Sequence, residues 1–248
     1  MVVYFRAYRI PAGTVVQPHR HAWWQFAYAR EGIIHVTLSH STIVLPPQYG
    51  MWIPANVRHT VLAADDVALE SLYIRSIPDG VAAADGRVVV VTDLVREFIH
   101  YACRKIGRRY DEAGPDGIKV RVLLDLLGEL PDAPLSLPLP ADEKLLEMCN
   151  AIQRLPERPH SLTGWAGELN MSSRTLARHF ARETGMTFLA WKQRLRLLQS
   201  LGLLKKGHSI TRIALDLGYS SASAYIYAFR KLFGAPPNRF RAGDQPPE

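Results

Sequence analysis

The sequence predicts an α+β chain of two domains: an N-terminal antiparallel β-barrel of the jelly-roll type with a helical hairpin, and a C-terminal all-α domain. Three observations predict it. Short β-like runs separated by turn residues fill the first 91 residues, a helix-turn-helix pattern occurs twice within Ser161–Arg241, and four prolines separate the two patterns. We therefore expect domains at 1–130 and 141–248, joined by a proline-rich linker at 131–140.

The expected strands of the first domain are runs rich in β-branched and aromatic residues. They are Val2–Ile10, Ile33–Leu38, Thr42–Leu45, Val67–Ser76 and Arg87–Val91. Apolar residues at helical spacing then predict two helices, Asp93–Ile106 and Gly117–Leu130, which would form an apolar hairpin beside the barrel.

The second domain is predicted from a duplicated pattern. Each copy starts with four apolar residues at positions i, i+3, i+4 and i+7, which form one stripe of a helix. They are Leu162, Trp165, Ala166 and Leu169 in the first copy, and Ile210, Ile213, Ala214 and Leu217 in the second. The serines able to cap the helices of each copy are Ser161 and Ser172, then Ser209 and Ser221. Two short helices joined by a tight turn, with the second exposed, form the unit that places a helix in a DNA major groove.

Two further helices complete this domain. Asp142–Leu155 is amphipathic and begins it. Between the two units, apolar residues share one face of Phe188–Lys205, and Gly207 follows as a C-terminal stop. This helix would be a rod that lets both exposed helices enter successive major grooves, and Trp191 is expected to lie in its core.

The charge distribution favours the same interpretation. Lys and Arg balance Asp and Glu in residues 1–140, 14 against 14, whereas residues 141–248 hold 16 against 9, which accounts for the whole net charge of +7. Because neutralisation of phosphates drives non-specific DNA affinity, cations concentrated on the helix-turn-helix units favour binding to double-stranded DNA.

The C-terminal segment resembles the DNA-binding domain of the AraC/XylS family of bacterial transcription regulators. The matching residues of the first unit are Leu162, Ala166, Ser172, Leu176, Arg178, Phe180 and Gly185. Those of the second are Ile210, Ile213, Ala214, Gly218, Tyr219, Ser221, Phe229, Phe233, Gly234 and Pro236, with Phe240 and Arg241 closing the domain. The match covers about the last third of the chain.

The second helix of each unit carries the residues expected to contact DNA. In the first unit they are Ser173, Arg174, Thr175, Arg178, His179 and Arg182, and in the second Ser223, Tyr227, Arg230 and Lys231. A guanidinium can bind guanine O6 and N7 together. Arg178 stands where the resemblance places a base-reading residue, while for Arg174 a phosphate contact is nearly as well favoured. Ser223 and Tyr227 align with these arginines and predict softer discrimination; the two cations that follow are expected on phosphates.

A second motif lies near the N-terminus. Gly13, His19, His21, Gln25 and Gly32 reproduce the spacing of the first cupin motif, G-x5-H-x-H-x3-E-x6-G, with Gln in place of Glu. The residues that resemble the second motif are Gly50, Met51, Trp52, Ile53, Pro54 and His59, with Asn56 where Gly is usual. The N-terminal half therefore resembles the cupin-like sensor of many AraC-type regulators.

This motif contains a candidate metal site. Alternate strand residues face one way, so His19, His21 and Gln25 would point into the barrel together, joined by His59. Three imidazoles and an amide oxygen could hold one divalent ion, Zn, Ni, Mn or Fe. Gln in place of a carboxylate removes a charge and should weaken binding. The alternative is that these groups bond an effector directly, or one another.

Aromatic residues cluster in sequence around this motif. Those assigned to effector binding are Trp24, Phe26, Tyr28, Trp52 and Tyr73. Aromatic walls with a few polar groups suit a small-molecule pocket, which favours an aromatic or hydrophobic effector. Alternation allows only some of these rings to face inward, and core packing is the alternative for each.

Together these patterns predict a cytoplasmic, sequence-specific transcription regulator that responds to a small molecule. The resemblance also implies control of a neighbouring transporter gene, and a homodimer formed through the helical hairpin, for which internal packing is the alternative. The chain shows no signal-peptide pattern and no apolar run near the roughly 20 residues of a membrane span, so no membrane partner is expected.

The alternative function is that of an enzyme, a metal-dependent cupin dioxygenase or isomerase with a DNA-binding appendage. The replaced Glu and the complete DNA-binding pattern count against it, so no catalytic residue is assigned. A thiol-based DNA-repair sensor with the same reader domain is excluded because Cys103 and Cys149 stand alone in sequence, as reduced thiols would.

Overall fold

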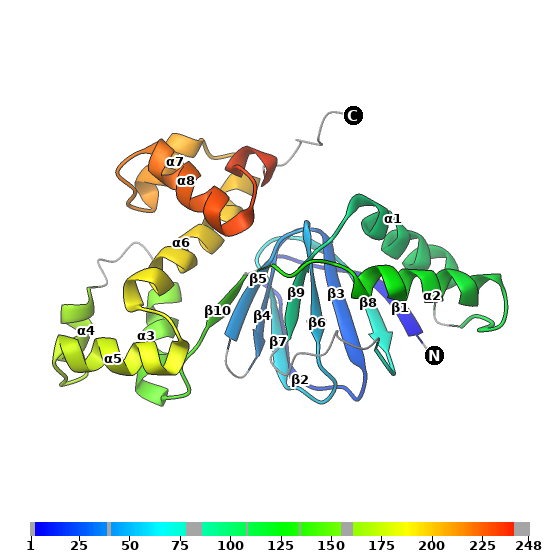
Figure 1. Ribbon diagram of the computed structural model, residues 1–248, viewed down its shortest axis with the longest axis horizontal. Helices are drawn as coiled ribbons and strands as arrows, with labels where there is room; N and C mark the ends of the chain where they lie inside the picture. The colour runs from blue at the N-terminus through cyan, green and yellow to red at the C-terminus, as the bar shows by residue number, and fades with distance from the viewer. Residues whose placement is uncertain are drawn as a thin grey trace. The chain divides into compact units, whose positions relative to one another are not determined.

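The computed structural model describes residues 3–38, 41–77, 86–107, 109–133, 135–154 and 161–240. The chain divides into two compact units, Met1–Ser136 and Leu137–Glu248 (Figure 1). The division falls within the segment predicted as a linker, 131–140.

The β-structure forms two separate five-stranded sheets. The strands are β1 Val3–Ile10, β2 Val15–His19, β3 Trp24–Glu31, β4 Ile34–Leu38, β5 Ser41–Leu45, β6 Tyr49–Ile53, β7 His59–Ala63, β8 Val67–Ile74, β9 Arg87–Val90 and β10 Ser136–Pro138. Their order is β1-β8-β3-β6-β9 in one sheet and β10-β5-β4-β7-β2 in the other. The antiparallel fold is confirmed, but the closed barrel is wrong, since no pairing among the described strands joins the sheets. Pro18 lacks an N–H and suits the edge position of β2.

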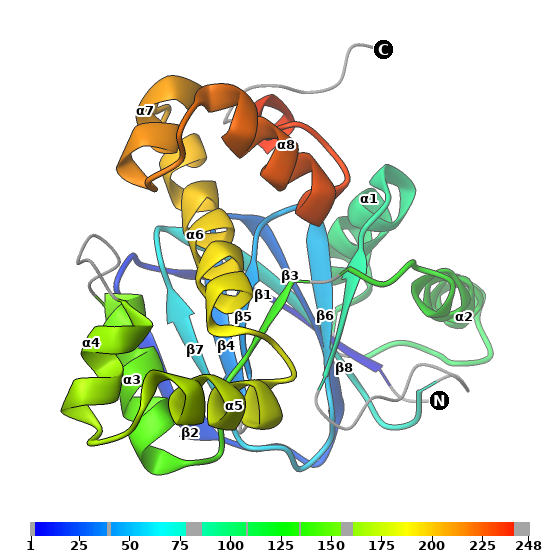
Figure 2. The ribbon, with the colours of Figure 1, turned by 60° about the vertical axis from the view of Figure 1, so that its left-hand side comes forward.

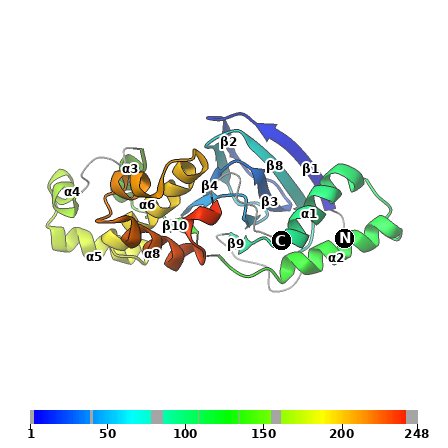
Figure 3. The same cartoon turned by 90° about the horizontal axis from the view of Figure 1, so that it is seen from above.

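Two helices cover one face of the first sheet (Figures 2 and 3). Helix α1, Asp93–Tyr101, continues through a π-helical turn at Ala102–Ile106, so the two together have the predicted bounds. Helix α2, Pro115–Gly128, begins and ends two residues before the predicted helix. The core under the helices includes Phe26, Tyr28, Trp52 and Leu72 of the sheet with Val95, Ile99, Leu123 and Leu127 of the helices. Full burial of one such side chain contributes about 1.5–3 kcal/mol, so this layer holds the hairpin on the sheet.

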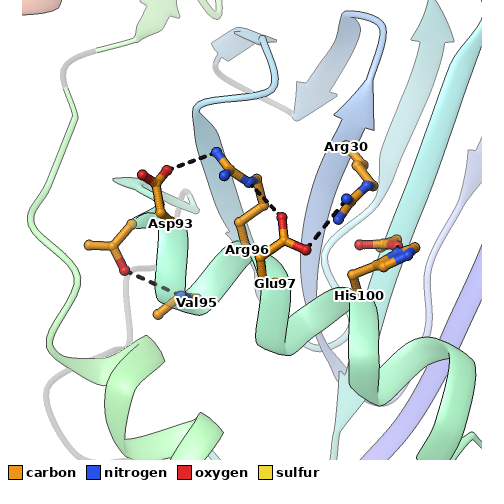
Figure 4. A network of polar contacts seen from close by, with 8 residues as sticks. Arg30, Asp93, Val95, Arg96, Glu97 and His100 are labelled. Atoms are coloured by element: carbon orange, nitrogen blue, oxygen red, sulfur yellow. Dashed lines mark hydrogen bonds and ion pairs between the residues drawn. The ribbon is translucent and has the colours of Figure 1, made fainter. Parts of the chain in front are cut away.

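A polar network orients α1 on the sheet (Figure 4). Glu97 lies 3.1 Å from Arg96 and 3.5 Å from Arg30 of β3. One turn on, Nδ1 of His100 lies 2.5 Å from Oε1 of Glu70 on β8, whose side chain is buried. Exposed ion pairs contribute about 0–1 kcal/mol each, so the network fixes the position of the helix more than its stability.

The sequence predicted that the segment after α2 is a connector without regular structure. The structure instead places parts of it in both sheets. Val90 donates to the carbonyl of Pro131 and Ala133 donates to that of Val88, so 131–133 continues the first sheet. Strand β10 then lies at an edge of the second sheet, where Pro138 is tolerated. Proline content alone cannot distinguish an edge strand from a linker.

Unit 2 is helical. Its helices are α3 Glu143–Arg154, α4 Leu162–Glu168, α5 Ser173–Thr184, α6 Phe188–Lys205, α7 Ile210–Asp216 and α8 Ala222–Phe233, followed by a 3-10 turn at Pro237–Phe240. Each predicted capping serine accepts a hydrogen bond from the backbone N–H three residues on, at 3.0–3.2 Å: Ser161, Ser172, Ser209 and Ser221. The bounds of α6 are those predicted, and Trp191 is fully buried as expected. The predicted end of the first helix, Leu155, lies outside the described residues.

No helix in the described parts of the chain is long and apolar enough to cross a membrane.

The start of unit 2 can be tested with fragments. Nε1 of Trp191 donates to the carbonyl of Pro138 at 2.7 Å. A fragment that starts at Ala141 leaves this buried N–H without its acceptor, so we expect it to be about 1–3 kcal/mol less stable than one that starts at Leu137. Denaturant unfolding of both fragments measures the difference, and Trp191→Phe in each should reduce it. Equal stabilities would show that residues 137–140 are dispensable.

Candidate functional site

Helix α5 presents a cationic face. Leu176, Phe180 and Thr184 are buried along one side of the helix, which fixes its rotation. Arg174, Thr175, Arg178 and Arg182 are exposed, and Ser173 is half-buried. Arg174 and Arg178 are four residues apart and share this face, as predicted. The Thr175 hydroxyl lies 2.8 Å from that of the capping Ser172, so the two hydroxyls share a hydrogen bond at the start of the helix.

His179 lies apart from this face, on the flank of α5. Its Nε2 is 3.9 Å from Asp142 and 3.8 Å from Glu183, and its side chain is 20% exposed. This placement against two carboxylates does not support the predicted contact of His179 with DNA. The sequence could not show it, because Asp142 comes from the start of another helix.

Helix α8 presents a different surface. Tyr225 and Phe229 are buried, whereas Tyr227 is 72% exposed. The predicted residues of this helix all line one shallow depression of about 690 Å³, together with Ile226 and Gly234: Ser223, Tyr227, Arg230 and Lys231. The face combines two cations with a hydroxyl and a ring, and it lacks the paired arginines of α5. The exposed side chains of α5 and α8 therefore differ in chemistry, as predicted.

Three histidines converge beside the face of the first sheet that lies opposite helices α1 and α2, called the inner face below. His19 ends β2 and pairs across the strands with His59, the first residue of β7, while His21 lies in the turn before β3. The ring centroids of His19 and His59 are 4.3 Å apart, and those of His21 and His59 are 5.1 Å apart. One nitrogen from each ring lies within 4.8 Å of the others. The predicted cluster is thus brought together, although a turn positions His21.

Each ring is oriented by a backbone carbonyl. Nδ1 of His19, His21 and His59 lies 2.9, 2.6 and 3.0 Å from the carbonyls of Gln17, Trp23 and Val57. A carbonyl only accepts, so each Nδ1 carries the proton and Nε2 is left with a lone pair. This arrangement is typical of metal-ligating histidines.

The surroundings of Gln25 also fit a cation. Its Oε1 lies 2.9 Å from Nε2 of His21, and its amide nitrogen donates to Ser71 at 3.0 Å. Two acceptor oxygens on one neutral imidazole cannot both be satisfied. A cation between the nitrogen and the oxygen would remove this mismatch, and so would a rotated amide, which donates to His21 instead. The buried Nε2 of His59 has no hydrogen-bond partner among the described residues. The residues therefore fit a divalent ion.

Two turn residues hold the motif in shape. Asn56, where Gly is usual in the motif, has φ 63°, and its N–H donates to the carbonyl of His21 at 2.7 Å. Asn tolerates this left-handed conformation, so the departure from the motif does not disturb the turn. Gly32 has φ 85°, and a Cβ there would lie 2.5 Å from the carbonyl oxygen of Asp66.

The aromatic residues predicted to bind an effector lie on opposite faces of the first sheet. Phe26, Tyr28 and Trp52 are fully buried in the helix-covered core, and Trp24 packs against it. Tyr73 alone of the five lies beside the histidines, with its ring centroid 5.3 Å from that of His21. The structure thus does not bring the other four to the histidine cluster. Their alternation along β3 matches core packing, the alternative noted for them.

Residues that sequence analysis missed share the face of Tyr73. Tyr4, Arg6 and Tyr8 alternate along β1, while Val3 and Phe5 on the other side of the strand point into the helix-covered core. A Tyr-x-Arg-x-Tyr run within the predicted strand was the available signal. Nothing in the sequence indicated that β1 pairs with β8, which carries Tyr73.

The protonation of His59 predicts how the stability of the folded, metal-free protein depends on pH. The pKa of His59 is lowered to about 4, mainly by burial, with smaller contributions from His19 and His21 and against the hydrogen bond to Val57, which raises it. Since the folded pKa is below the unfolded value of about 6.5, the stabilisation is present above pH 6.5 and is lost as pH falls toward 4. We expect metal-free protein to lose up to about 3 kcal/mol across this window. Urea unfolding at several pH values measures it, and His59→Gln should flatten the curve; an unchanged slope would contradict the assignment.

Comparison with known proteins agrees with both halves. Residues 165–243 match the family described as a helix-turn-helix domain, and residues 7–75 match the cupin domain family. The chain is 32% identical over 240 residues to the HTH-type transcriptional regulator NimR of Escherichia coli K12, which covers 95% of this chain and 87% of that protein. It is 33% identical over 106 residues to the HTH-type transcriptional regulator RipA of Corynebacterium glutamicum, covering 43% of this chain and 32% of that protein. The solved structure of ToxT from Vibrio cholerae is 11% identical, with a TM-score of 0.40, and covers 97% of this chain and 98% of that one.

Proposed function

This chain belongs to the AraC family of helix-turn-helix transcriptional regulators, and we propose that it reads a specific DNA sequence with α5 and α8 in two successive major grooves. The observation that carries the proposal is the exposed face of α5, where Arg174 and Arg178 stand side by side on a helix whose other side is buried. The concentration of the net charge of +7 in residues 141–248 supports it.

Selection of binding sites from random DNA by the whole chain tests this function. We expect two enriched half-sites whose centres lie about 10–10.5 base pairs apart, with the α5 half more strictly specified. The same chain can then be located across a genome, where the genes beside its sites would test control of a transporter gene. Selected pools without any enriched sequence would contradict sequence-specific binding.

We propose that unit 1 is the sensor for a small-molecule effector. The match to the cupin domain family supports this, as does the cluster of His19, His21, His59 and Gln25 on the inner face. These residues would hold one divalent ion, Zn, Ni, Mn or Fe. Such an ion would supply a Lewis-acid site within the sensor unit.

We favour regulation over catalysis for this cluster. The relatives named above are transcriptional regulators. Gln25 stands where the motif has Glu, and an amide cannot take up a proton as a general base would. A reader of operator DNA acts on the chromosome, so we place the chain in the cytoplasm.

We infer that the helical hairpin pairs two copies of the chain. Leu94 of α1 is 64% exposed, and Ile118 and Val122, one turn apart on α2, are 53% and 46% exposed. These exposed apolar side chains lie on helices whose other side is packed on the sheet. Such a surface suits a self-complementary contact. Ile118→Asp should convert a dimer into a monomer in sedimentation, while Arg121→Asp on the same helix should not. A wild-type chain that sediments as a monomer would contradict the pairing.

A further inference from the structure

The inner face of the first sheet carries two arginines among aromatic rings, next to the histidine cluster. Along β1, Tyr4 pairs across the strands with Tyr73 of β8, and Arg6 pairs with Ser71. The guanidinium carbon of Arg6 lies 5.5 Å from the ring centre of Tyr8 and 6.0 Å from that of Tyr73. Arg6 is therefore held against two rings on an exposed part of this face.

A second cation–ring pair extends the face. The guanidinium of Arg75 lies 5.1 Å from the ring of Trp23, which packs on Tyr4 with ring centroids 4.9 Å apart. Both arginines are exposed, and neither has a carboxylate within 4.0 Å in the part of the chain that the structure describes. By contrast, Arg9 on the same strand is paired with Glu31 at 3.3 Å. Two cations without acidic partners give this face a local positive charge, although residues 1–140 carry equal numbers of charges of each sign.

Direct contacts link this face to the histidines. Gln25, which lies 2.9 Å from His21, donates to the buried Ser71 at 3.0 Å. Tyr73 pairs across the strands with Gln25, and its ring centroid lies 5.3 Å from that of His21. A ligand that displaces Tyr73 would therefore change the surroundings of Gln25 and His21.

We propose that this face, defined by Tyr4, Arg6, Tyr8, Trp23, Tyr73 and Arg75, binds the effector, and that the effector is a small planar molecule bearing a carboxylate. Guanidinium groups stack on rings through their faces, which leaves their N–H edges free for bidentate bonds to a carboxylate. Arg6 binds the carboxylate, and the exposed ring of Tyr4 and the half-buried ring of Trp23 stack on the planar body. This inference rests on the proposed sensor function of unit 1.

The chemistry of this face separates such a ligand from others. A neutral planar molecule would stack on the rings but leave the N–H edge of Arg6 in water. An aliphatic carboxylate would reach Arg6 but leave the rings uncovered. We therefore expect affinity to depend on both parts of the ligand, with the charge giving the larger discrimination.

Two probes of the same shape test the proposal on the whole chain: 2-naphthoate and its neutral amide, 2-naphthamide. Titrations followed by ligand-observed NMR should show at least tenfold weaker binding for the amide. Arg6→Gln should weaken 2-naphthoate at least tenfold and leave 2-naphthamide unchanged. Arg9→Gln on the same strand is the matched control and should leave both unchanged. The titration is repeated after treatment with a chelator, and binding should persist.

Equal affinity of the two probes, or 2-naphthoate binding that Arg6→Gln leaves intact, would overturn the assignment. Loss of binding on chelation would do so too, because the carboxylate would then be bound by a metal ion. The DNA selection described above separates these results from failure of the proposed function. If Arg6→Gln still enriches the wild-type DNA site, only the ligand assignment is at issue.

Discussion

Protein purified without chelators or nickel resin is expected to contain about one divalent ion per chain, held by His19, His21 and His59. Their Nδ1 protons are bonded to backbone carbonyls, so three Nε2 lone pairs are available without rearrangement. Because the ligands must be neutral, acidification should release the ion. Elemental analysis of dialysed protein at decreasing pH measures this release.

Variants distinguish a metal site from a hydrogen-bonded cluster. His21→Ala should abolish the ion while operator affinity without effector changes little, since the histidines and the DNA-binding helices belong to different units. Gln25→Glu should tighten the site, because it supplies an anionic ligand, and the Ser71 hydroxyl, which accepts from the Gln25 amide, can donate to the carboxylate instead. If metal-free protein responds fully to its effector, the proposed metal site is wrong, while the proposed function as a regulator is unaffected. The histidines would then be expected to contact the effector themselves.

The largest effect on DNA is expected from Arg178→Ala. The side chain is exposed on α5 one turn from Arg174, and a bidentate contact with guanine contributes about 1–3 kcal/mol of discrimination. The variant should therefore bind its best site about 5–150-fold more weakly and lose preference at one base pair in the α5 half-site. Repeated selection from random DNA with the variant shows which position relaxes.

Lys231→Ala is the matched control on α8. As a phosphate contact, it should weaken binding to all sequences alike and reduce the dependence on salt concentration by about one unit of log–log slope. An Arg178→Ala variant with the wild-type base preference and only a reduced salt dependence would reassign Arg178 to a phosphate. Equal relaxation at several positions would instead indicate that the helix itself is disturbed.

Local patterns determined the helices of unit 2. The caps at Ser161 and Ser209, the ends of α5 and α8 at Gly185 and Gly234 and the bounds of α6 all follow from side chains within a few residues of the feature. Capping and helical periodicity act over one or two turns, so the sequence carries them in full. Both exposed faces follow from the same periodicity.

Contacts between residues far apart in the sequence decided which groups lie beside these helices and strands. His179 lies on the predicted helix, but only the fold places Asp142 beside it, 3.9 Å from its Nε2. Residues 131–133 and β10 belong to a stretch with the composition of a linker, yet 131–133 is hydrogen-bonded to β9 and β10 lies next to β5 at the edge of the second sheet. Edge pairing depends on which strand lies alongside, a property that composition does not encode.

In unit 1 the sequence determined the alternation of β1 and β3, and the tertiary structure decided what each face meets. Phe26 and Tyr28 point one way along β3 and Gln25 the other, as period two requires. Only the docking of α1 and α2 makes the first face a core, and only the pairing of β1 with β8 sets Arg6 beside Tyr73. Side-chain parity is fixed by the backbone of a single strand, whereas the partner of each face depends on residues far away in the chain.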